Sequence, residues 1–154
     1  MQGLGFLFAL EPFLRGAYRE PERYRGAALR HLEHFNTQPY MAGLILGAVG
    51  ALEEERAARP ESAGAESARR IAKLKGMMGA ALAAIGDSFF WGALRPACAA
   101  WTLLVWLVLW TLRVPFWPAL GAAFYLLAYN GPALWLRWHG IRLGYELNTD
   151  FVPE

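Results

Sequence analysis

The sequence predicts an all-α integral membrane protein, with N-terminal buried or re-entrant helices followed by a two-helix transmembrane hairpin. Of the 154 residues, 56% are hydrophobic and 18% are charged, which is too apolar for an ordinary soluble domain of this size. Residues 96–136 contain one charged side chain, Arg113. Before them, charged segments alternate with glycine-rich apolar stretches at residues 40–52 and 76–84. These stretches are too short to cross a bilayer and therefore suit re-entrant or protein-buried segments.

The hairpin is predicted from two apolar runs, residues 97–112 and 114–127. Each run is slightly shorter than the roughly 20 residues that cross a hydrocarbon core, but uncharged flanking residues extend both. The Val-Pro-Phe-Trp-Pro sequence at residues 114–118 interrupts a helix and predicts the turn between them. Most of the tryptophans fall toward the ends of the runs, where amphipathic rings favour the headgroup layer.

Basic residues predict the orientation of this hairpin. Arg95 precedes it, Arg137 and Arg142 follow it, and most other lysines and arginines stand earlier in the chain. Because cytoplasmic segments are enriched in basic residues, both ends of the hairpin are expected in the cytoplasm, with Arg113 near the outer face.

The contrast between a charged N-terminal part and an apolar hairpin divides the chain into residues 1–95, which carry the polar motifs, and residues 96–154. In the first part, Pro21 predicts a helix over residues 22–35, and the Asn-Thr-Gln-Pro sequence that follows ends it and starts another. That next helix, residues 40–59, carries Gly43 and Gly47 at a spacing that allows close helix contact. A polar cytoplasmic linker is expected at residues 60–67, and a further helix from residue 68. The second part comprises the hairpin and a C-terminal cytoplasmic segment.

Polar side chains gather at the end of the first of these helices. His31 and His34 are one turn apart, but no third ligand stands nearby, so no metal site is predicted. Two interpretations remain for these histidines. Either they cap carbonyl groups and pack at a helix end, or they converge with nearby amides on a polar ligand at membrane depth.

A second polar group follows the glycine-bounded segment 79–86. Asp87 is either an acid that meets water, a partner or a ligand at membrane depth, or the N-cap of a helix over residues 88–94, and both can hold. The three glutamates at residues 53–55 predict a solvated acidic face.

Catalysis within this chain is not expected. The sequence contains no nucleophile with a positioned base and no phosphate loop, and Cys98 is the single cysteine. We therefore predict no catalytic residue and no cofactor. The net charge of +2 and the lack of a basic run with interleaved aromatics argue against a nucleic-acid partner. A membrane-embedded enzyme using His31, His34 and Asp87 is a distant alternative.

Several motifs resemble component IID of the mannose/fructose/sorbose family of sugar phosphotransferase systems. In chain order they are RHLEHFNTQPY, ALEEE, GMMGAALAAIGDSFFWGALRP and GIRLGYELNTDFV. Together with residues 1–12 they cover nearly the whole chain, and the hairpin is similar in character. Typical members carry a proline where Ala80 and Ala81 stand here, and they continue through a further membrane portion after the last motif.

The resemblance implies a multi-pass subunit of the bacterial inner (cytoplasmic) membrane. In that family, IID pairs with a IIC membrane subunit to translocate a hexose, while IIA and IIB components carry the phosphoryl group; membrane lipid surrounds the pair. The implied sugar contacts are His31, Asn36, Thr37, Glu54 and Asp87. The expected function is thus a non-catalytic subunit of a phosphoenolpyruvate-dependent sugar permease. Because the chain is short for the family, the alternative is a regulatory or scaffolding remnant without transport activity.

Overall fold

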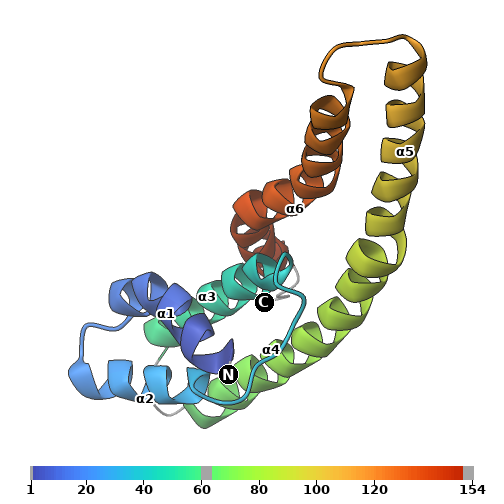
Figure 1. Ribbon diagram of the computed structural model, residues 1–154. Helices are drawn as coiled ribbons and strands as arrows, with labels where there is room; N and C mark the ends of the chain where they lie inside the picture. Colours follow the sequence, from blue (N-terminus) through green and yellow to red (C-terminus); the bar gives the residue numbers. More distant parts are fainter. Residues whose placement is uncertain (1, 60–63, 151–154) are drawn as a thin grey trace.

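The structure, a computed structural model, describes residues 2–59 and 64–150, and this part of the chain is helical throughout apart from connecting turns (Figure 1). The all-α prediction is confirmed. The predicted linker residues 60–63 and residues 151–152 of the last motif lie outside the described residues. In chain order the elements are α1 (Gln2–Ala17), α2 (Pro21–His31), α3 (Ala42–Ala58), α4 (Gly64–Asp87), the π-helix η2 (Ser88–Leu94), α5 (Arg95–Thr111) and α6 (Trp117–Asp150).

The first three helices form the core of the molecule. In α1 and directly after it, Phe6, Leu10, Leu14 and Tyr18 recur every four residues and are all buried, so one face of the helix is apolar. This face packs against α3, whose residues 45–53 are buried without a break. A helix that is buried on every side needs cover from several neighbours, and α1, α4 and α6 all contact α3.

Helix α2 begins with Pro21 in its first turn, as predicted, but it ends at His31 rather than at residue 35. The chain leaves the helix early because Phe35 turns inward, where its ring lies 4.5 Å from the ring of Phe6. Residues 32–41 therefore form an irregular connection, which we call the α2–α3 loop.

Helices α3 and α6 cross in close contact, although they are far apart in sequence. A Cβ atom added to Gly47 would lie 1.9 Å from the backbone oxygen of Ile141, and one added to Gly144 would lie 1.9 Å from that of Leu44. Only glycine permits such an approach of two backbones. The predicted close contact through Gly43 and Gly47 is confirmed.

Helix α4, η2 and α5 form one continuous curved helix (Figure 1). It begins at Gly64, inside the predicted linker, and it includes the apolar stretch 76–84 as a middle portion. The wider π-helical turn ends at Leu94, two residues before Pro96, which has no N–H to give to an α-helical hydrogen bond. Among the described residues, this is the one helix long and apolar enough to cross a membrane.

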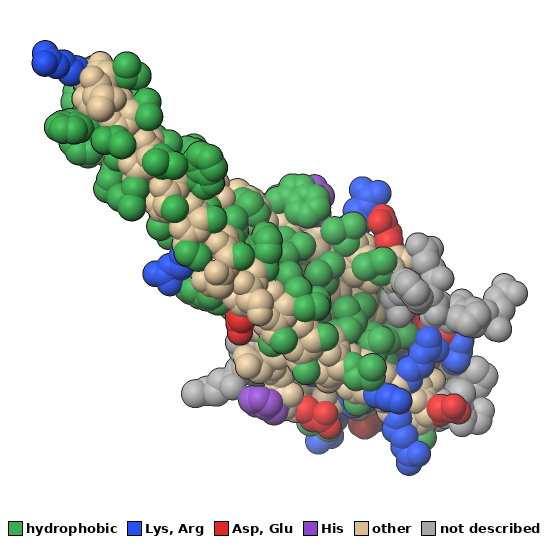
Figure 2. Space-filling view, turned by 90° about the vertical axis from the view of Figure 1, so that its right-hand side faces the viewer, with side chains coloured by type: hydrophobic (Ala, Val, Ile, Leu, Met, Phe, Trp, Pro, Cys, Tyr) green, Lys and Arg blue, Asp and Glu red, His purple; other side chains and the backbone are tan. Residues whose placement is uncertain are grey.

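Helix α6 returns antiparallel to α5 after a tight turn (Figure 1). Arg113 and Phe116 in this turn have positive φ angles of 54° and 61°. Trp106 Nε1 donates a hydrogen bond of 3.2 Å to the backbone oxygen of Pro118 and ties the two helices together near the turn. Figure 2 shows the resulting arm covered with hydrophobic side chains, whereas most charged side chains gather at the broad end formed by the N-terminal helices.

Candidate functional site

The centre of the N-terminal part is a buried carboxylate, Glu53 of α3. Its side chain is 0% exposed and accepts hydrogen bonds from three side chains. Tyr18 Oη donates at 2.6 Å, Arg30 Nη2 donates to both carboxylate oxygens at 2.9 and 3.1 Å, and His31 Nε2 lies 2.9 Å from Oε1. Because an ionised carboxylate only accepts hydrogen bonds, His31 Nε2 carries the proton in this contact.

These contacts keep Glu53 ionised. Burial by itself would raise the pKa of its carboxyl group, but the hydrogen bonds from His31 and Tyr18 and the charge of Arg30 outweigh burial and lower the pKa. For Tyr18, burial and the neighbouring Glu53 carboxylate raise the pKa of the phenol. The network joins α2 and α3 to the end of α1 and fixes the start of the α2–α3 loop.

The α2–α3 loop lies along α4 at two glycines. A Cβ on Gly79 would lie 3.3 Å from the backbone oxygen of Asn36, and one on Gly86 would lie 2.6 Å from the Gln38 side chain. The two polar motifs that the sequence analysis singled out, around residues 30–37 and 79–88, are therefore neighbours in space. The small residues of α4 make this close approach possible.

The structure places the five predicted site residues in different environments. His31 is 1% exposed and belongs to the Glu53 network, and Thr37 is also buried. Asn36 and Asp87 are exposed. Glu54 is half-buried, and its Oε2 accepts a hydrogen bond of 2.6 Å from Tyr145 Oη of α6. His31 thus ends α2, Asn36 and Thr37 lie on the α2–α3 loop, and Glu54 lies on α3. Asp87 follows Gly86, at which α4 contacts Gln38.

Two interpretations from the sequence are wrong. Asp87 is not an N-cap, because its φ and ψ of −65° and −44° are helical and its side chain makes no capping hydrogen bond. The glutamates at 53–55 are not a solvated acidic face, because Glu53 is fully buried. The spacing of Ile45, Val49 and Glu53, which recurs every four residues, places Glu53 on a buried face and was the signal that sequence reasoning missed.

Sequence reasoning also missed two buried polar residues, Gln38 in the α2–α3 loop and Lys75 of α4 beside it. Lys75 of α4 lies under the rings of Phe6 and Phe35. It lines a cavity of about 330 Å³ between the loop and α4. The loop contributes Asn36 to the lining of this cavity, and α4 contributes Gly76 and Gly79 among others.

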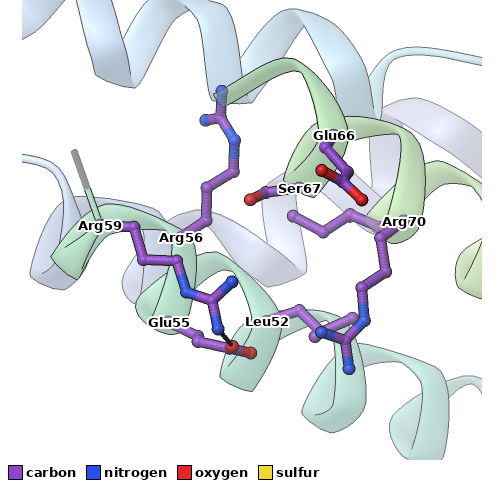
Figure 3. Close-up of a pocket in the computed structure, with 8 residues that line it drawn as sticks. Leu52, Glu55, Arg56, Arg59, Glu66, Ser67 and Arg70 are labelled. Atoms are coloured by element: carbon purple, nitrogen blue, oxygen red, sulfur yellow. Dashed lines mark hydrogen bonds and ion pairs between the residues drawn. The ribbon is translucent and has the colours of Figure 1, made fainter. Parts of the chain in front are cut away.

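A smaller cavity of about 110 Å³ lies between the end of α3 and the start of α4 (Figure 3). Three arginines, two glutamates and Ser67 surround it, and Arg59 forms an ion pair with Glu55. That ion pair lies at the C-terminal end of α3, and both helices contribute charges of both signs to the lining. We interpret this cavity as part of the charged contact between α3 and α4 rather than as a ligand site.

Comparison with known proteins agrees with these features. The family described as the mannose/fructose/sorbose family IID component of the phosphotransferase system matches residues 1–154. The mannose-specific EIID component of Escherichia coli K12 is 37% identical over 156 aligned residues, which cover 100% of this chain and 50% of that protein. The sorbose-specific EIID component of Lacticaseibacillus casei is 36% identical, again over 100% of this chain and 50% of the relative.

Solved structures show the same fold. A chain of the mannose transporter ManYZ in complex with microcin E492 superposes with a TM-score of 0.78 at 35% identity, over 99% of this chain and 52% of that chain. A second structure, described as a membrane protein, gives a TM-score of 0.73 at 36% identity, over 95% of this chain and 50% of that chain. The chain spans about half the length of the curated relatives it matches. From its match over all 154 residues and its fold, the chain belongs to the mannose/fructose/sorbose family of phosphotransferase-system IID components, which are membrane proteins.

Proposed function

We propose that this chain acts as a non-catalytic membrane subunit of a phosphoenolpyruvate-dependent sugar permease. In this proposal a IIC partner and this chain together bind and translocate a hexose, while IIA and IIB components deliver the phosphoryl group. The observation that carries the proposal is the contact between the α2–α3 loop and α4, which gathers polar groups beside a cavity. The similarity to mannose-specific and sorbose-specific components supports a role in transport over a scaffolding role.

The predicted sugar residues take two roles in this proposal. Asn36 and Asp87 are exposed, so they are available to hydrogen-bond a sugar directly or through the IIC partner. His31 and Thr37 are buried and position the loop that carries Asn36. Glu54 contacts α6 through Tyr145 and links the site to the hairpin.

The membrane arrangement follows from the distribution of apolar surface. We propose that α5 and α6 cross the bacterial inner membrane as a hairpin whose two ends lie in the cytoplasm. Large hydrophobic side chains are exposed on both helices, for example Trp101 (61%), Leu107 (54%) and Leu127 (74%), and lipid covers such surfaces favourably. Residues 96–154 then form the membrane hairpin and its cytoplasmic end, and residues 1–95 carry the polar motifs.

Co-purification with a IIC subunit, followed by sugar binding to the complex, tests this function. The wild-type chain should form a stable complex that binds mannose, fructose or sorbose. Asn36→Ala and Asp87→Asn should each weaken sugar binding by about 1 to 3 kcal/mol without reducing the yield of the complex. A chain that captures no IIC subunit, or a complex that binds none of the three sugars, contradicts the proposal.

A further inference from the structure

Lys75 is a buried cation for which the described part of the chain provides no oxygen partner. Its side chain is 6% exposed, and its Nζ has no hydrogen-bond or ion-pair partner among the described residues. The ammonium lies 4.8 Å from the centroid of the Phe6 ring and 5.4 Å from that of Phe35. The ring faces attract a positive charge, but they leave the three N–H donors without the strong acceptors that water or a carboxylate would provide.

The cavity beside Lys75 contains groups of complementary chemistry. Glu33, His34 and Asn36 line it from the α2–α3 loop, opposite the small residues Gly76 and Gly79 of α4. Burial lowers the pKa of the Lys75 ammonium and the Glu33 carboxylate partly opposes this effect, yet no ion pair joins the two side chains. The cavity of about 330 Å³ is at the lower end of the range for small-molecule sites, which is roughly 300 to 1,000 Å³.

This combination favours a neutral ligand with many hydroxyl groups. A hydroxyl oxygen can accept a hydrogen bond from Lys75, while another hydroxyl of the same molecule donates to Glu33 or bonds to Asn36. An anion such as a phosphate would satisfy Lys75 but would be repelled by the Glu33 carboxylate. A purely apolar ligand would leave the buried Lys75 ammonium without a partner.

We propose that Lys75, together with Glu33, forms a hexose subsite in this cavity, and that Lys75 is a specificity-determining residue for unphosphorylated sugar. The proposal rests on the proposed function, since it assigns further residues to the sugar site of the same subunit. It adds two charged residues to the proposed sugar contacts, which are His31, Asn36, Thr37, Glu54 and Asp87.

The test uses the purified complex of the full chain with its IIC partner and measures affinity for mannose, fructose, sorbose and mannose 6-phosphate by calorimetry. Lys75→Met keeps the length and apolar stem of the side chain but removes the ammonium. We expect it to weaken binding of the preferred sugar about tenfold or more, which corresponds to losing one hydrogen bond to a charged group. Lys73→Met on the same helix removes an exposed cation and should leave the affinity unchanged.

Folding is followed separately by thermal unfolding. Lys75→Met removes a poorly solvated charge from among two phenylalanine rings, so its melting temperature should equal or exceed that of the wild type. Glu33→Gln is an exposed second variant, which should weaken sugar binding several-fold and leave unfolding unchanged. Unaltered sugar affinity in Lys75→Met overturns the subsite, as does tighter binding of mannose 6-phosphate than of mannose by the wild type. A wild-type complex that binds no sugar at all contradicts the proposed function itself.

Discussion

Glu53 and His31 meet in a hydrogen bond of 2.9 Å although they are 22 positions apart, and neither side chain is more than 1% exposed. Their contact joins the end of α2 to the middle of the core helix α3. Because the α2–α3 loop starts directly after His31, the same bond determines where the loop and its polar residues lie.

Glu53→Gln should destabilise the protein on the order of 3 kcal/mol. The amide keeps the shape of the side chain, but the substitution leaves the largely buried Arg30 guanidinium without its counter-ion. Thermal unfolding in detergent measures the change. Glu55→Gln is the matched control, because its i,i+4 pair with Arg59 is partly exposed and should contribute less than about 0.5 kcal/mol. Equal effects of the two substitutions would contradict the role given to Glu53.

The stability of the protein should fall on acidification because the folded state lowers the pKa of Glu53. Its contribution is complete above the unfolded pKa of about 4.3 and is lost as the pH falls through that value toward the lower folded pKa. The melting temperature should therefore drop below about pH 4 more steeply in the wild type than in Glu53→Gln. Parallel pH profiles of the two proteins would show that groups other than Glu53 cause the loss of stability in acid.

Gly47→Ala and Gly144→Ala should each separate α3 from α6. The new methyl group would lie 1.9 Å from a backbone oxygen in both cases, and a backbone crossing cannot yield as a flexible side chain can. We expect a loss of about 1 to 3 kcal/mol in unfolding free energy. Gly26→Ala in α2 is the control, because no atom lies within 4 Å of the added Cβ and alanine favours the helix by up to about 1 kcal/mol. Wild-type stability in both crossing variants would be inconsistent with this packing.

A cysteine at Arg113 should be labelled by a membrane-impermeant thiol reagent added outside intact cells, because the turn between α5 and α6 is expected at the outer face. A cysteine at Arg69 should be labelled only after the cells are permeabilised. Both variants are made in a Cys98→Ala background, although Cys98 is buried. Labelling of Arg69→Cys from outside intact cells would contradict the proposed orientation.

Much of the fold could be predicted from local sequence signals. Pro21 started a helix, α6 begins at Trp117 within the Val-Pro-Phe-Trp-Pro sequence, and the spacing of Gly43 and Gly47 predicted a close helix contact. Helix ends that depend on packing were less predictable. Helix α2 stops early because Phe35 packs on Phe6, and residues 64–67 join α4 although their composition suggests a linker.

The site was only partly predictable, because burial depends on contacts between distant residues. The polar motifs around Asn36 and Asp87 were recognised from sequence, and the glycines of α4 bring them close together. The sequence predicted that Glu53 is one of three solvated acids, whereas packing of the N-terminal helices buries it completely. Lys75 stands among other basic residues in the sequence, and only the inward-facing Phe6 and Phe35 distinguish it.

Hexose uptake by cells that lack every other IID subunit tests the central claim most directly. The cells express IIA, IIB and IIC components with or without this chain, and accumulation of labelled mannose, fructose and sorbose is measured. The account predicts phosphoenolpyruvate-dependent accumulation of at least one sugar only when the chain is present, and its loss in Asn36→Ala. If the chain assembles with IIC in the membrane but supports uptake of none of the three sugars, its assignment as a transport subunit is contradicted.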